Sequence, residues 1–252
     1  MSRKKLLLGA ILFILGLIGI ASLLTVDFPL PPEAEAALRA QFTPQQIKFL
    51  TLVNPTILLL VAVAVGTFLH ELAGLKVPLI GSIVGIENNS ISLVDALKYG
   101  IIGGIAAGVL LSLTGLIFTP LLPDEFVELG EKLSPTLAAR FLYGGITEEI
   151  LMRFGLMTFI VFIASKIVKD TSPKVYWIGI LIAAIIFALG HFPVAFMAVE
   201  SPSPTLLIYI LIGNSIGGII FGWLYWKKGL ESAFIAHIFA HVVMVLAEPM
   251  IQ

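Results

Sequence analysis

The sequence predicts an all-α fold, a polytopic membrane helix bundle of about seven transmembrane helices. Hydrophobic residues make up 58% of the 252 residues and charged residues only 12%, whereas soluble domains average about 45–50% and about 25%. The mean hydropathy is +1.05. A chain of this size cannot hide so much apolar surface in its own core, so the lipid bilayer must be its solvent.

Charge and cysteine content exclude several classes of function. The formal net charge is -1, which leaves no basic excess for binding nucleic acid. The chain has no cysteine, which rules out a disulfide scaffold, thiol catalysis and thiolate metal sites. The expected partners are the lipid bilayer and a substrate, with no nucleic acid, and the sequence specifies no oligomeric state.

Seven stretches are long and apolar enough for a membrane helix, which needs about 20 such residues. The first follows three basic residues, as a signal peptide would, but its apolar run is too long and no small-x-small cleavage site follows. We therefore expect it to be retained as a helix. The seven stretches are 6–26, 49–69, 99–119, about 138–165, 175–198, 205–226 and 230–248.

Shorter segments connect these spans. Segment 77–86 is apolar but contains Pro78 and two glycines, so we expect an interfacial or re-entrant piece. The connections 31–43 and 123–134 are polar and are expected to carry short surface helices. An eighth span remains an alternative to seven.

The distribution of Lys and Arg predicts an N-terminus inside and, with seven spans, a C-terminus outside. We expect an integral, multi-pass protein of a prokaryotic plasma membrane with its N-terminus in the cytoplasm. This orientation puts four basic residues outside: Arg39, Lys48, Lys132 and Arg140. It puts ten inside: Arg3, Lys4, Lys5, Lys76, Lys98, Lys166, Lys169, Lys174, Lys227 and Lys228.

Glycines recur in three rows with small-xxx-small spacing, which lets membrane helices approach closely. We expect all three rows to be packing surfaces, and Asn214, which lies among them, to make a packing hydrogen bond. The first row is Gly100, Gly104 and Gly108, the second Gly213 and Gly217, and the third Gly218 and Gly222.

Span four contains three ionisable residues near mid-depth, Glu148, Glu149 and Arg153. A charged side chain at this depth in the membrane costs at least about 2.5–3.5 kcal/mol, so the presence of three ionisable residues together needs an explanation. Glu149 and Arg153 have the i,i+4 spacing of a helical ion pair. Such a structural pair leaves Glu148 unexplained, because it lies about 100° from Glu149 around an α-helix. Glu148 is therefore the candidate general base, with Glu149 and Arg153 as its structural support.

Three of the four histidines fall within apolar spans. His191 ends span five, whereas His237 and His241 lie i,i+4 on one face of span seven. Their presence beside two buried acids favours a catalytic site. The remaining histidine, His70, is followed by Glu but not by the second His of a zincin motif, because position 74 is Gly74. We expect His70 to be an interfacial side chain.

The order of these motifs resembles that of the CPBP family, the CAAX protease and bacteriocin-processing (Abi) intramembrane proteases, which include the type II CAAX prenyl endopeptidases. The resemblance covers roughly 135–250, so we divide the chain into N-terminal membrane helices at 1–134 and a catalytic core at 135–252, within one membrane unit. The motifs are Glu-Glu-x-x-x-Arg at Glu148, Glu149 and Arg153, Phe-x-x-x-His at Phe187 and His191, and His-x-x-x-polar at His237 and His241.

The resemblance implies an intramembrane endopeptidase acting on a peptide or lipidated protein, such as a prenylated CAAX substrate. Glu148 and His191 would activate a water. His237 and His241 would stabilise the oxyanion, and Phe187 would support the site. The family usually has Asn or Asp at the position of His241, and a histidine can also donate the hydrogen bond.

Alternatives to this interpretation remain. We expect a reaction without a cofactor, but zinc held by Glu148, His191 and His237 is a plausible ligand set. A proton-coupled transporter would also bury Glu, Arg and His within the membrane. A catalytically inactive scaffold of the same fold would retain the helices without the reaction.

Overall fold

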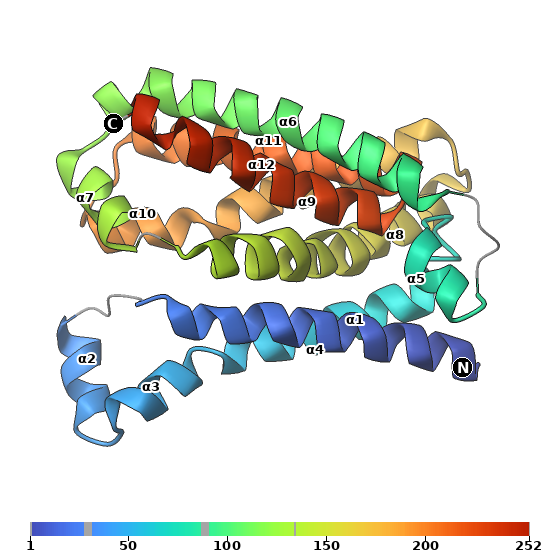
Figure 1. Ribbon diagram of the computed structural model, residues 1–252, viewed down its shortest axis with the longest axis horizontal. Coiled ribbons are helices and arrows are strands. Elements are labelled where there is room, and N and C mark those ends of the chain that lie inside the picture. The colour runs from blue at the N-terminus through green and yellow to red at the C-terminus, as the bar shows by residue number, and fades with distance from the viewer. Residues whose placement is uncertain (1, 28–31, 87–90, 134, 252) are drawn as a thin grey trace.

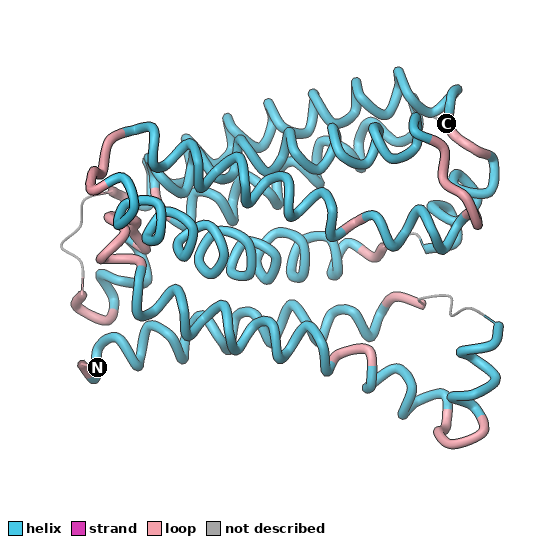
Figure 2. The backbone as a smooth tube through the Cα atoms, turned by 180° about the vertical axis from the view of Figure 1, so that it is seen from behind, coloured by secondary structure: helices cyan, strands magenta, loops and turns pink. Residues whose placement is uncertain are grey.

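The computed structural model describes residues 2–27, 32–86, 91–133 and 135–251, and the regular structure in these ranges is entirely helical (Figure 1 and Figure 2). The helices that form most of the bundle are α1 (Arg3–Ser22), α4 (Val53–Leu69), α6 (Leu93–Phe118), η3 (Ala139–Glu148), η4 (Ile150–Met157), α8 (Thr158–Val168), α9 (Pro173–Gly190), α11 (Pro204–Lys228) and α12 (Leu230–Ile251). The other helices are η1 (Leu23–Thr25), α2 (Pro32–Arg39), α3 (Pro44–Leu50), α5 (Pro78–Ile83), η2 (Thr119–Leu121), α7 (Asp124–Leu133) and α10 (Phe192–Ala198).

Seven helical spans in the described ranges are long and apolar enough to cross a membrane, which confirms the number expected from the sequence. They are Arg3–Thr25, Pro44–Leu69, Leu93–Leu121, Ala139–Val168, Pro173–Ala198, Pro204–Lys228 and Leu230–Pro249. The marked chain ends lie at opposite ends of the bundle (Figure 1), as an odd number of spans requires. The protein is therefore an integral, multi-pass membrane protein.

The short segments between the spans also contain helices. Apolar segment 77–86 contains the six-residue helix α5 rather than an eighth span. The two polar connections contain α2 and α7, while residues 31 and 134 lie outside the described residues. Helices α2 and α3 extend away from the main bundle at one end of α1 and α4 (Figure 1).

Span four is the central helix of the bundle. Its first half, η3, packs against α1 on one side and α12 on the other, and its second half, η4, packs against α4, α9 and α11. Gly66 of α4 and Gly155 of η4 permit this packing, since a Cβ on Gly66 would lie 2.3 Å from the ring of Phe154 and one on Gly155 would lie 2.5 Å from Cβ of Ala62. The two adjacent acids, Glu148 and Glu149, are thus carried by the helix that has neighbours on both sides.

Two of the three glycine rows pack helices together as predicted. A Cβ on Gly104 would lie 2.5 Å from the backbone oxygen of Ala236, and the same row brings α6 onto α12. A Cβ on Gly218 would lie 2.6 Å from Cβ of Ala184, where α11 meets α9. The close approach of these helices therefore depends on having glycine, which carries no side chain, at these positions.

His70 is not the interfacial side chain that the sequence suggested. It is fully buried, its Nδ1 lies 2.9 Å from the backbone oxygen of Gly66, and its ring packs against that of Phe154 at a centroid distance of 5.6 Å. The sequence gives no sign of this burial, because His70 lies at the end of an apolar span. The side chain turns back along α4 toward span four.

We expect Gly104→Ala to destabilise the protein by about 1–3 kcal/mol, because the added methyl group meets backbone atoms of α12 that cannot rotate away. The measurement is the thermal midpoint in detergent. Gly130→Ala is the control, since a Cβ there has no heavy atom within 4 Å. Equal midpoints for the two variants would contradict the proposed role of the Gly104 row.

Candidate active site

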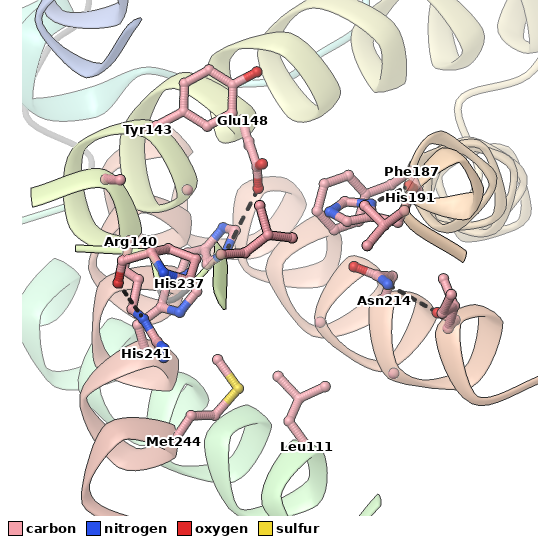
Figure 3. Close-up of a pocket in the computed structure, with 18 of the residues that line it drawn as sticks. Leu111, Arg140, Tyr143, Glu148, Phe187, His191, Asn214, His237, His241 and Met244 are labelled. Atoms are coloured by element: carbon pink, nitrogen blue, oxygen red, sulfur yellow. Dashed lines mark hydrogen bonds and ion pairs between the residues drawn. The ribbon is translucent and has the colours of Figure 1, made fainter. Parts of the chain in front are cut away.

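A cavity of about 490 Å³ lies within the bundle, between η3, α9, α11 and α12 (Figure 3). The four side chains expected to carry the chemistry, Glu148, His191, His237 and His241, all line it. They come from three different spans, so they meet only because the bundle folds. Most of the remaining wall is apolar, with Asn214 and Tyr209 among the polar exceptions.

The helix that carries Glu148 is wider than the α-helix assumed from the sequence. Residues Ala139–Glu148 and Ile150–Met157 have π-helical geometry, in which hydrogen bonds run from i to i+5 and which often occurs at functional sites. Five residues of η3 line the cavity, and each is four or five positions from another of them, as residues on one face of such a helix are: Ala139, Arg140, Tyr143, Gly144 and Glu148.

The buried carboxylate of Glu149 contacts both Arg153 and His237, so it connects the supporting ion pair to a histidine of the cavity wall. Its side chain has no exposed surface, and its Oε2 lies 3.1 Å from Nε of Arg153. Its other oxygen, Oε1, accepts a hydrogen bond from Nδ1 of His237 at 2.9 Å. The predicted i,i+4 ion pair is therefore present, and the same carboxylate also orients a histidine, which the sequence did not indicate.

Arg153 is buried among aromatic rings as well as beside Glu149. The centre of its guanidinium lies 5.4 Å from the ring centroid of Phe187 and 5.8 Å from that of Phe221. Its Nη1 and Nη2 have no hydrogen-bond partner among the described residues. Stacking on ring faces therefore supplies part of the stabilisation of this buried cation.

Glu148 faces the cavity on the other side of His237. The side chain of Glu148 is 18% exposed, in contrast to the fully buried Glu149, and its Oε2 lies 4.0 Å from Nε2 of His237. One ring nitrogen of His237 is thus directed at Glu149 and the other at Glu148. Of the two adjacent acids, Glu148 is the one that a molecule in the cavity can reach.

His191 lies on a separate wall of the cavity and is oriented by its own helix. Its Nδ1 donates to the backbone oxygen of Phe187 at 2.9 Å, and the rings of Phe187 and His191 meet edge to face at 4.7 Å. A carbonyl oxygen can only accept, so this hydrogen bond places the proton on Nδ1 and leaves Nε2 as an acceptor. Phe187 therefore positions both His191 and Arg153.

His241 stacks on His237, with centroids 5.0 Å apart, and Phe221 stacks on the other face of His237 at 4.6 Å. This arrangement holds the His237 ring between two flat neighbours. A Cβ on Gly144 would lie 2.8 Å from Nε2 of His241. The glycine therefore allows the histidines of α12 to approach η3.

The second glycine row does not pack helices together, contrary to the sequence prediction. Gly213 and Gly217 line the cavity, and a Cβ on Gly213 would meet only Cδ2 of Leu111, at 4.0 Å. The contact of α11 with α9 uses the adjacent face of α11. The second row faces the cavity instead, and the atoms nearest to a Cβ on Gly217 belong to Phe221 of the same helix, at 3.2 Å. Asn214 does make a hydrogen bond, from Nδ2 to the backbone oxygen of Ile210 at 2.9 Å, within its own helix.

Sequence reasoning missed several polar side chains in the cavity wall, among them Arg140 and Tyr143. Arg140 was counted only among the outer basic residues. The signal that could have found it is its position eight residues before Glu148, which puts both on one helix face. Tyr143 has no comparable signal, because a tyrosine in an apolar span is ordinarily a packing residue.

No three His, Asp or Glu side chains among the described residues are placed so that they could hold one metal ion. The alternative zinc set predicted from the sequence, Glu148, His191 and His237, is not such a group in this arrangement. His237 uses Nδ1 to contact Glu149, which leaves Nε2 as the nitrogen facing Glu148.

Comparison with protein families supports the resemblance seen in the motifs. Residues 131–243 match the family model of the Rce1-like type II CAAX prenyl endopeptidases. No curated protein and no solved structure matches the chain. The matched range contains all of the candidate site residues, and the family suggests CAAX intramembrane endopeptidase activity.

We expect Gly213→Leu to lower kcat/KM by about 100-fold or more, because the side chain would occupy the cavity and displace a bound substrate from its reactive position. Gly213→Ala, which adds one methyl group into open space, should retain most of the activity. Both variants should keep the thermal midpoint of the parent protein. Normal turnover by Gly213→Leu would show that substrate does not use this part of the cavity.

Proposed function

We propose that residues 131–243, which match an Rce1-like domain, hydrolyse a peptide bond of a CAAX-type peptide or lipidated protein within the membrane. The observation that carries this proposal is that Glu148, His191, His237 and His241, from three spans, face one cavity. A carboxylate and three histidines around one cavity are a costly arrangement in a membrane helix bundle. Catalysis explains that cost better than packing does.

In the proposed reaction Glu148 is the general base. Glu148 and His191, through its free Nε2, hold a water between them, and Glu148 accepts a proton from it. The resulting hydroxide attacks the carbonyl carbon of the scissile bond. When the carbon–nitrogen bond breaks, the proton passes from Glu148 to the leaving nitrogen, and the carboxylate is regenerated.

His237 and His241 are proposed to stabilise the oxyanion of the tetrahedral intermediate. Because His237 donates its Nδ1 proton to Glu149, it has a second proton to donate, from Nε2, only in the imidazolium form. His241 takes the place of the amide that is usual in the family. One such donor contributes about 3–4 kcal/mol in enzymes where it has been removed.

The two adjacent acids should differ when each is replaced by glutamine. Glu148→Gln should abolish turnover while keeping the thermal midpoint, because it removes the base from a partly exposed position. Glu149→Gln should lower stability by about 3–5 kcal/mol, since it leaves Arg153 buried without its counter-charge. The measurements are peptide turnover and thermal unfolding in detergent.

A double variant controls for this explanation. Glu149→Gln combined with Arg153→Met should recover part of the lost stability, because both partners of the pair are then removed. An unstable Glu148→Gln beside a stable but inactive Glu149→Gln would show that the base and the supporting acid have been exchanged.

We further propose that the reaction requires no metal ion. Purified protein should retain its peptidase activity after prolonged incubation with a strong chelator and should contain well under one zinc per chain. Loss of activity on chelation, with recovery on adding zinc, would instead make the histidines ligands.

A further inference from the structure

Arg140 is the one Lys or Arg among the described residues that line the catalytic cavity. It lies on the same face of η3 as Glu148, beside His241 (Figure 3). Its Nε donates to the backbone oxygen of Pro135 at 3.0 Å, which holds the guanidinium at one edge. Its Nη1 lies 2.6 Å from Oε1 of Glu248, near the end of α12.

The ion pair of Arg140 with Glu248 lies where the catalytic cavity adjoins a second pocket of about 440 Å³, which shares five lining residues with it. Arg140 lines both spaces, whereas Glu248 lines only the second. The side chain of Arg140 is 16% exposed and that of Glu248 is 43% exposed. A cation in the wall of the catalytic cavity is thus neutralised by a carboxylate that lies outside it.

From this geometry we propose that Arg140 binds the C-terminal carboxylate of the substrate, and that Glu248 forms an ion pair with the guanidinium of Arg140 when no substrate is bound. Arg pairs well with a carboxylate because its N–H groups can bond both oxygens. A carboxylate entering an apolar cavity needs such a partner. Glu248 is the more exposed partner of the pair, so an incoming carboxylate can replace it.

The spacing along η3 fits this role, which rests on the proposed CAAX peptidase function. Arg140 and Glu148 are eight residues apart, or at most about 12 Å along the axis at 1.5 Å per residue. Any bond within a four-residue C-terminal motif lies within three residues of the terminal carboxylate, and three extended residues span about 10–11 Å. A carboxylate at Arg140 therefore places a bond of the motif near Glu148.

The test compares two fluorogenic peptides that share one sequence, a prenylated cysteine followed by two aliphatic residues and one further residue. One peptide ends in a free carboxylate and the other in an amide. The parent protein should have a KM at least about tenfold lower for the carboxylate peptide. Arg140→Gln should raise that KM to the value found for the amide peptide.

Glu248→Gln distinguishes a binding role from a structural one. If Arg140 binds substrate, removing its internal partner should lower KM for the carboxylate peptide. If the ion pair merely joins η3 to α12, Arg140→Gln and Glu248→Gln should impair both peptides in the same direction, which would overturn the proposal. Lys132→Gln is the control, because Lys132 is 72% exposed and outside the cavity wall, and it should leave the ratio of the two KM values unchanged.

Failure of the proposed function would give a different result. If the parent protein cleaves neither peptide, the peptidase proposal fails. The carboxylate site is then tested by binding: the affinity of the same two peptides for the parent protein and for Arg140→Gln is measured by fluorescence polarisation. Tighter binding of the carboxylate peptide that is lost in Arg140→Gln would still support the carboxylate site. Equal binding of the two peptides by the parent protein would refute it.

Discussion

The buried carboxylate of Glu149 is the contact on which the organisation of the site depends. One of its oxygens faces Arg153 and the other accepts from His237, and none of its surface is exposed. A buried charge is tolerated only when it is paired and hydrogen-bonded. Glu149 meets that requirement by joining spans four and seven, so the pairing that stabilises the bundle also sets the orientation of the histidine.

The glycines of this protein have two opposite effects on packing, because they carry no side chain. Gly104 and Gly218 bring helices into contact, and Gly144 lets the histidines of α12 approach the helix of Glu148. Gly213 instead leaves space within the bundle. The same residue type thus creates close contact where a neighbouring helix lies opposite and creates a cavity where none does.

Much of the fold could be predicted from composition and run length. The bilayer requires long apolar helices, so seven runs gave seven spans with small differences at their ends. The Glu149–Arg153 pair also followed from spacing alone, since i,i+4 neighbours meet on one helix. The burial of His70 and the open space at Gly213 did not follow, because each depends on which helix lies opposite.

For the site, the sequence by itself determined that two acids occur within span four and histidines within spans five and seven, because such residues are too costly in a membrane to be incidental. Only the tertiary structure decided that Glu149 contacts His237, that Glu148 is the acid facing the cavity, and that Arg140 lies in its wall. The physical reason is that spacing fixes neighbours along one helix, whereas contacts between helices depend on how each helix is rotated within the bundle.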